Sequence, residues 1–130
     1  MGRKVLVIEN ESSIRNVIYV LLDALRCEGE VAYSGQQALA MIGRENFDAI
    51  LLDLRTSELP PDQVVSKICE IRPNLVGRIL FITGELSDPE IMASIERHCA
   101  PYVRRGRLMH DLWDRLHLVF GHTESPSAAR

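Results

Sequence analysis

The 130-residue sequence is poor in cysteine, and the three cysteines that it has form no motif. Cys27, Cys69 and Cys99 are far apart, odd in number and without the paired spacing of metal ligands, so we expect them to pack as small apolar residues. Also missing is any apolar run near the ~20 residues that cross a bilayer, and the first residues lack the apolar segment of a signal peptide. We therefore expect a cytoplasmic protein with no membrane partner.

The chain carries no surplus of basic residues. Its formal net charge is −3, and its 25% charged and 46% hydrophobic residues are typical of a soluble globular protein, so no nucleic-acid partner is expected. The sequence shows no internal repeat and no linker, and 130 residues can bury a core without a metal or a disulfide. We expect one domain over residues 1–120 and a polar tail over residues 121–130.

Short apolar segments alternate five times with helix-like patterns. The expected strands are residues 5–8, 30–33, 48–53, 78–83 and 102–105. Apolar residues with helical spacing are Ile14, Val17, Ile18, Leu21, Leu22 and Leu25 in the first helix, Val64, Val65, Ile68 and Ile71 in the third, Ile91, Met92 and Ile95 in the fourth, and Met109, Leu112, Trp113, Leu116, Val119 and Phe120 in the last. This alternation predicts a three-layer α/β protein with a parallel five-stranded sheet. We expect the flavodoxin-like (βα)5 strand order 2-1-3-4-5, with a crevice between the first and third strands.

Helix boundaries are indicated by capping residues and proline. Ser34 and Gln37 stand in capping-box register and place a helix start at Ser34, and Ser87 with Glu90 gives the same signal for the fourth helix. The segment of residues 55–63 contains a proline pair and is expected to be a loop, and the third helix should stop before Pro73.

Two of the expected strands end in carboxylates. Glu9 and Asn10 follow the first strand and Asp53 ends the third, so all three should face the crevice. Oxygen ligands of this kind suit a hard cation such as Mg²⁺, and a cation beside an acid suggests phosphoryl chemistry. A single acid after a strand is more often a helix cap or a solvated turn, and Glu11 fits that description.

Three further residues fall at the same edge. Thr83 closes the fourth strand with a hydroxyl, Gly84 leaves open space beside it, and Arg105 ends the fifth strand with a cation that matches phosphate geometry. Taken singly, each has a simpler explanation as a local backbone partner, a turn residue or a solvated side chain.

From Lys4 to Phe120 the sequence resembles the receiver domains of two-component response regulators. The resemblance implies that Asp53, in the motif LLDL, accepts a phosphoryl group from a sensor histidine kinase or a histidine phosphotransfer protein. It implies a Mg²⁺ site formed by Glu9, Asn10, Asp53 and the backbone carbonyl of Arg55, and a phosphoryl-binding and switch set formed by Thr83, Gly84, Tyr102 and Arg105. It also implies a downstream protein bound at the face of the fourth helix, fifth strand and last helix, with homodimer formation left open.

The sequence departs from that family at several of these positions. Asn10 replaces an acid that usually contacts Mg²⁺, so the resemblance leads us to expect weaker metal binding. Arg105 stands where the family has lysine, and Gly106 follows it in place of proline. A planar guanidinium need not contact the same phosphoryl oxygen as an ammonium group. Ser57 and the sequence LPPDQ likewise change the loop after Asp53.

Arg55 admits two interpretations. Its long side chain could swing back to pair with Glu9 or Asp53 and occupy the place of the metal, or it could point into solvent. The residues alone do not separate the two.

The leading interpretation is a stand-alone receiver that signals by protein contact and is no enzyme beyond its own phosphotransfer and dephosphorylation. The alternative is a pseudo-receiver that binds a partner without being phosphorylated. The same domain could also be a receiver from a longer hybrid kinase. A metal-dependent hydrolase is disfavoured because no second acid follows Asp53 in the sequence DLR. A nucleotide-binding domain is disfavoured because no glycine-rich loop follows the first strand.

Overall fold

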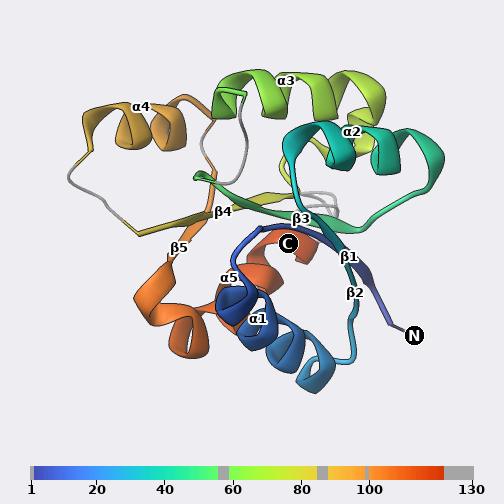
Figure 1. Ribbon diagram of the computed structural model, residues 1–130, viewed down its shortest axis with the longest axis vertical. Coiled ribbons are helices and arrows are strands. Elements are labelled where there is room, and N and C mark those ends of the chain that lie inside the picture. The colour runs from blue at the N-terminus through green and yellow to red at the C-terminus, as the bar shows by residue number, and fades with distance from the viewer. Residues whose placement is uncertain (1, 56–58, 85–87, 99, 122–130) are drawn as a thin grey trace, which may run out of the picture.

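The computed structural model describes residues 2–55, 59–84, 88–98 and 100–121, which form a sheet of five strands with helices on both sides (Figure 1). The strands are β1 (Lys4–Ile8), β2 (Glu28–Ala32), β3 (Ala49–Asp53), β4 (Ile79–Thr83) and β5 (Tyr102–Arg104). The helices are α1 (Ser12–Ala24), α2 (Gly35–Arg44), α3 (Pro61–Ile71), α4 (Pro89–His98) and α5 (Leu108–Gly121), with short 3₁₀ turns at Pro73–Leu75 and Arg105–Arg107.

All neighbouring strands are parallel, in the order β2-β1-β3-β4-β5. This order confirms the predicted flavodoxin-like topology and the predicted α/β class. The central strands β1, β3 and β4 are short continuous apolar runs because both of their faces are covered, as expected for a parallel sheet.

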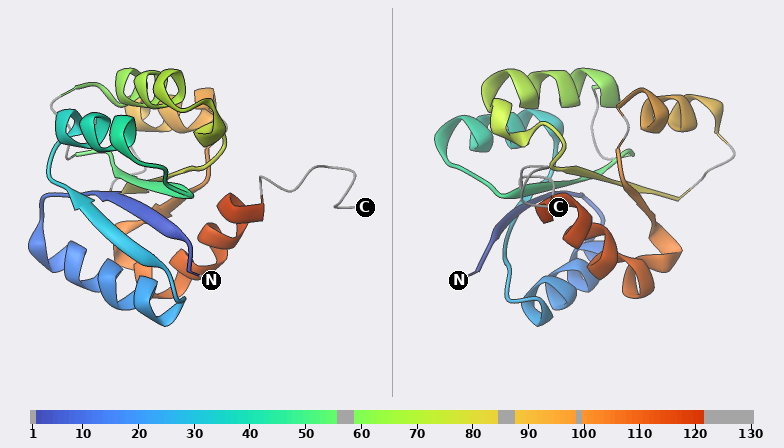
Figure 2. Two further views of the ribbon diagram at one scale, coloured as in Figure 1. Left: turned by 90° about the vertical axis from the view of Figure 1, so that its right-hand side faces the viewer. Right: turned by 180° about the vertical axis from the view of Figure 1, so that it is seen from behind.

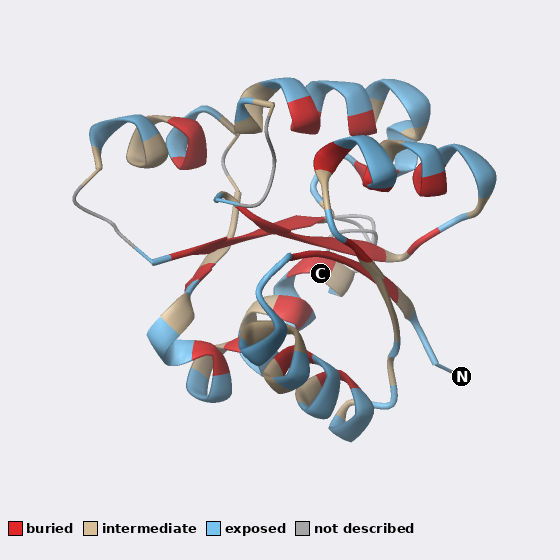
Figure 3. Cartoon of the chain, viewed as in Figure 1, coloured by how far each residue is buried: buried red, intermediate tan, exposed pale blue. Residues whose placement is uncertain are grey.

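The two faces of the sheet carry separate halves of the core. Helices α2, α3 and α4 cover one face and α1 and α5 the other, as the three views show (Figures 1 and 2). Alternate residues of β1 serve the two halves: Leu6 and Ile8 pack on the α2–α3–α4 side, and Val5 and Val7 pack on the α1–α5 side. Figure 3 shows the consequence, a buried sheet between helices whose outer surfaces are exposed.

One helix start confirms its predicted cap, and one differs from prediction. The Ser34 side chain accepts a hydrogen bond from the Gln37 backbone N–H at 3.1 Å, which confirms the predicted start of α2. Helix α3 begins at Pro61, inside the predicted loop, because proline suits the first helical turn, and it stops before Pro73 as predicted. Ser87 lies outside the described residues, as do Cys99, Ser57 and residues 122–130 of the predicted tail; the described part of α4 begins at Pro89.

Two strand predictions need correction. Strand β2 lies earlier than residues 30–33, because its parallel pairing begins with Glu28 opposite Lys4. Strand β5 ends at Arg104, which pairs with Thr83, the last residue of β4, so Arg105 has no strand partner and opens a 3₁₀ turn instead of ending the strand.

The predicted apolar stripes are wrong at three positions. Helix α5 buries Leu108, Leu112, Leu116 and Val119 against the sheet. Met109 and Trp113 follow the first two of these by one residue, a rotation of about 100°, and they are 74% and 56% exposed. Ile71 is exposed because it is the last residue of α3.

A polar cluster joins α3 to α4. Asp62 accepts hydrogen bonds from Ser94 Oγ at 3.0 Å and from Arg97 Nη2 at 2.6 Å, and its Oδ1 lies 2.7 Å from His98 Nε2. Burial acts to raise the pKa of Asp62, but the bonds to His98, Arg97 and Ser94 together lower it. The cluster is therefore a stabilising connection between the two helices.

The two described cysteines behave as ordinary core residues. Cys27 and Cys69 are free and half-buried against the core, and burial raises the pKa of both thiols. Among the described residues, the structure has no helix with the length and apolar character that a membrane span requires.

Candidate functional site

Two carboxyl groups meet at the edge of the sheet where the strands end. Asp53 is the last residue of β3, and Glu9 directly follows Ile8 of β1, which pairs with Leu52 of β3. Both acids are fully buried, at 0% exposure. Burying a charged carboxylate costs folding free energy unless other groups compensate the charge. The partners of the two acids therefore decide what the site can do.

Asp53 is compensated by two arginines. Its Oδ1 accepts a hydrogen bond from the Arg55 backbone N–H at 2.8 Å. Arg105 Nη2 lies 3.3 Å from both Asp53 oxygens, and Arg55 Nε lies 3.7 Å from Oδ1. The predicted neighbourhood of Asp53 and Arg105 is therefore present, as a direct ion pair between the two side chains.

Glu9 has one satisfied oxygen and one unsatisfied oxygen. Its Oε2 accepts a hydrogen bond from the Glu11 backbone N–H at 3.2 Å, whereas the buried Oε1 has no hydrogen-bond donor among the described residues. Burial, a hydrogen bond shared with Asp53 and repulsion by the Asp53 charge raise the pKa of Glu9 to about 8, against smaller lowering effects of the Glu11 N–H and Arg105. The raised pKa therefore favours the protonated form of Glu9 beside Asp53 in the absence of a cation.

Arg55 links the two loops that follow β1 and β3. Its Nη2 donates to Glu11 Oε1 at 3.0 Å, so the side chain is not free in solvent. It pairs with Asp53, one of the two predicted acids, and with Glu11. Glu11 occupies the N-cap position of α1 without a side-chain cap, and its carboxylate instead binds Arg55 and Ser13 Oγ. Sequence reasoning missed this partner because the contact joins two loops whose course is not encoded in any local pattern.

A small cavity of about 240 Å³ opens beside the acids, lined by Leu54, Arg55, Thr83, Gly84, Ile91 and Arg105. Thr83 is buried at the end of β4. The space that was predicted beside Gly84 is taken by the Arg105 guanidinium.

The two remaining predicted residues are Asn10 and Tyr102. Asn10 is exposed next to Glu9. Tyr102 lies opposite Phe81 in the β4–β5 register, two residues from the Thr83 position, and is half-buried against the α2–α3–α4 side of the core. The structure thus brings Glu9, Asp53 and Arg105 into one constellation and leaves Tyr102 at its periphery.

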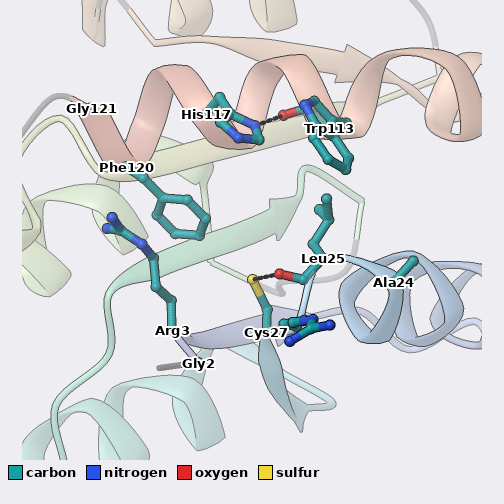
Figure 4. A pocket seen from close by; sticks show the side chains of 10 residues that line it. Gly2, Arg3, Ala24, Leu25, Cys27, Trp113, His117, Phe120 and Gly121 are labelled. Atoms are coloured by element: carbon teal, nitrogen blue, oxygen red, sulfur yellow. Dashed lines mark hydrogen bonds between the residues drawn. The ribbon is translucent and has the colours of Figure 1, made fainter.

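A larger cavity of about 800 Å³ lies at the opposite edge of the sheet, between the start of β1 and α5 (Figure 4). Arg3 lies over the ring of Phe120 at 4.5 Å, and Trp113 stacks on His117 at 4.9 Å. None of the described residues that line this cavity carries a carboxylate, so the paired acids at the other edge are the better candidate site.

The model of the response regulator receiver domain family matches residues 5–116 of the chain. The chain belongs to this family. It is a signalling domain of two-component systems, and receiver domains of this kind interact with histidine kinases and downstream effectors.

The receiver domain has relatives that are longer than itself. The transcriptional regulatory protein SrrA of Staphylococcus aureus is 31% identical over 103 residues, which cover 79% of this chain and 42% of SrrA. The chain therefore spans less than half the length of the curated relatives that it matches.

Solved structures share the fold of this receiver domain. The receiver domain of the sensor histidine kinase PA1611 from Pseudomonas aeruginosa, solved with a magnesium ion coordinated in its active site cleft, has a TM-score of 0.73 at 21% identity, covering 90% of this chain and 99% of that one. NtrX from Brucella abortus has a TM-score of 0.75 at 23% identity, covering 100% of this chain and 30% of that one.

Proposed function

We propose that this receiver domain accepts a phosphoryl group on Asp53 from a histidine kinase or a histidine phosphotransfer protein. The observation that carries the proposal is the position of Asp53, which is buried at the end of β3 beside a small cavity and in contact with Arg105. An Asp53 oxygen would attack the phosphorus of a phosphohistidine, forming the P–O bond while the P–N bond breaks. Arg105 would balance the charge of the transferring group, and the Thr83 hydroxyl would hydrogen-bond the product.

The described residues fit a hard cation at this site. The buried Glu9 Oε1 has no hydrogen-bond partner among the described residues, and repulsion by the Asp53 charge helps to raise the pKa of Glu9, so a cation bound by both carboxylates would relieve that repulsion. We propose Mg²⁺ held by Glu9, Asp53, Asn10 and the Arg55 backbone carbonyl. When bound, the ion would offset negative charge on the phosphoryl oxygens. The described residues include no cluster of three acidic, histidine or cysteine ligands, which supports the expectation of weak binding.

Output is proposed to occur by protein contact at the face formed by α4, β5 and α5. Thr83 and Tyr102 lie on the neighbouring strands β4 and β5, so a change at the phosphoryl site would reach this face through one pair of strands. A downstream protein is the proposed partner, and a second copy of the domain would use the same face. The domain would span residues 1–120, and we place it in the cytoplasm, where a kinase would supply the phosphohistidine.

A second candidate function is a pseudo-receiver that binds its partner without phosphorylation. The observation that favours it is the compensation of Asp53 by Arg105 and the Arg55 N–H, which leaves the carboxylate paired before any ligand arrives. In that case the α4–β5–α5 face would have a single state.

Binding of beryllofluoride, a mimic of a phosphoryl group on aspartate, separates the two functions without requiring catalysis. Fluorine NMR with Mg²⁺ present should show a bound signal for the wild type and none for Asp53→Asn. A wild type that shows no bound signal at high Mg²⁺ would support the pseudo-receiver.

A further inference from the structure

The Arg105 guanidinium lies directly against the bare Cα of Gly84. A Cβ added to Gly84 would fall 1.9 Å from Arg105 Nη1 and 3.0 Å from Cζ, and the first of these distances is far shorter than any real contact. In this position Nη2 of the same guanidinium reaches both Asp53 oxygens at 3.3 Å. The approach of the cation to the acid therefore depends on the absence of a side chain at residue 84.

The width of the guanidinium, not its charge, creates this dependence. Arg105 is largely enclosed, with 16% of its side chain exposed, and its buried Nε has no hydrogen-bond partner among the described residues. The group is thus held by the Asp53 pair and by the shape of its surroundings. An ammonium on a thin aliphatic stem has no second nitrogen to place over residue 84.

We propose that Gly84 is a positioning residue for Arg105, so that glycine at residue 84 and arginine at residue 105 are coupled in setting access of a cation to Asp53. The geometric part of this inference is independent of the proposed function, whereas its effect on phosphoryl acceptance rests on that function. The coupling predicts that a methyl group at residue 84 is harmful with arginine at 105 and harmless with lysine there.

The variant Gly84→Ala should fold. Positive φ values among the described glycines occur only at Gly77, so alanine is compatible with the backbone at residue 84. The collision would involve the far end of a flexible side chain, which can turn away while the main chain stays in place. Gly106→Ala is a matched control, since a Cβ added there meets nothing within 4 Å.

The experiment compares Gly84→Ala, Arg105→Lys, the double variant and Gly106→Ala with the wild type. Crystal structures report whether Arg105 still contacts Asp53, and intact mass against time reports the rate of phosphorylation by phosphoramidate. We expect Gly84→Ala to move Arg105 off Asp53 and to slow phosphorylation about a hundredfold, the low end of the effect of removing one charge-stabilising donor. The double variant should react as fast as Arg105→Lys alone, and Gly106→Ala should match the wild type.

Two results would overturn the inference: Arg105 still bound to Asp53 in Gly84→Ala, or an equal slowing by Gly84→Ala in the arginine and lysine backgrounds. If the wild type takes up no phosphate, the proposed function fails while the crystal structures still decide the coupling of residues 84 and 105.

Discussion

Replacing Glu9 by glutamine should remove a pH dependence of stability that the wild type possesses. The pKa of Glu9 is raised from 4.5 to about 8 in the folded protein, so between these values the folded state holds a proton that the unfolded chain has released. The associated stabilisation is complete below pH 4.5 and is lost as the pH rises through 8. At about 1.4 kcal/mol per pKa unit, the full effect is at most about 5 kcal/mol.

The useful window lies between pH 6.5 and pH 9. Over it, the free energy of unfolding of the wild type should fall by about 2 kcal/mol more than that of Glu9→Gln, whose neutral amide mimics the protonated acid. A cation bound to Glu9 would change the contribution of its proton to stability. Urea unfolding, followed by circular dichroism, is therefore carried out with a chelator. Glu11→Gln is the control, because Glu11 is exposed and its ion pair with Arg55 lowers its pKa, away from this window. Parallel pH profiles for the wild type and Glu9→Gln would refute the assignment of a buried, protonated Glu9.

Three other predictions concern the cluster at Asp62 and the cation site. Asp62→Ala removes the contacts of α3 with three residues of α4 and should lower the free energy of unfolding by about 1–2 kcal/mol, measured in urea. The control Lys67→Ala, at an exposed position of α3, should leave the free energy of unfolding unchanged. Arg55→Ala removes a cation 3.7 Å from Asp53 and should tighten Mg²⁺ binding several-fold by calorimetry; equal or weaker binding would contradict the proposed electrostatics. At pH 8.5, Mg²⁺ should raise the melting temperature of the wild type more than that of Glu9→Gln, and identical shifts would argue against Glu9 as a ligand.

The fold was predictable because its signal is regular. Four-residue apolar runs mark three of the five strands, strands and helices alternate along the chain, and parallel sheets with short crossovers have few alternatives. The prediction was poorest for β2, an edge strand whose residues are mostly half-buried and therefore show a weak apolar pattern. It also misjudged Met109 and Trp113, since apolar side chains one position away from the buried stripe extend its pattern while facing solvent.

The sequence predicts that Glu9 and Asp53 meet, but not which cation pairs with which acid. Parallel strands end at one edge, so Glu9 and Asp53 had to meet there whatever the loops do. Which cation approaches which acid depends on loop paths and on the room left by neighbours. Arg55 reaches Glu11, and Arg105 passes Gly84, through contacts that no local pattern encodes.

The most direct test of the central claim is the intact mass of the protein after incubation with a small phosphodonor, with and without Mg²⁺, compared with Asp53→Asn. We predict a gain of one phosphoryl group that requires Mg²⁺ and is absent from Asp53→Asn. No gain in the wild type at high Mg²⁺, or the same gain in both proteins, would contradict Asp53 as the phosphoryl acceptor.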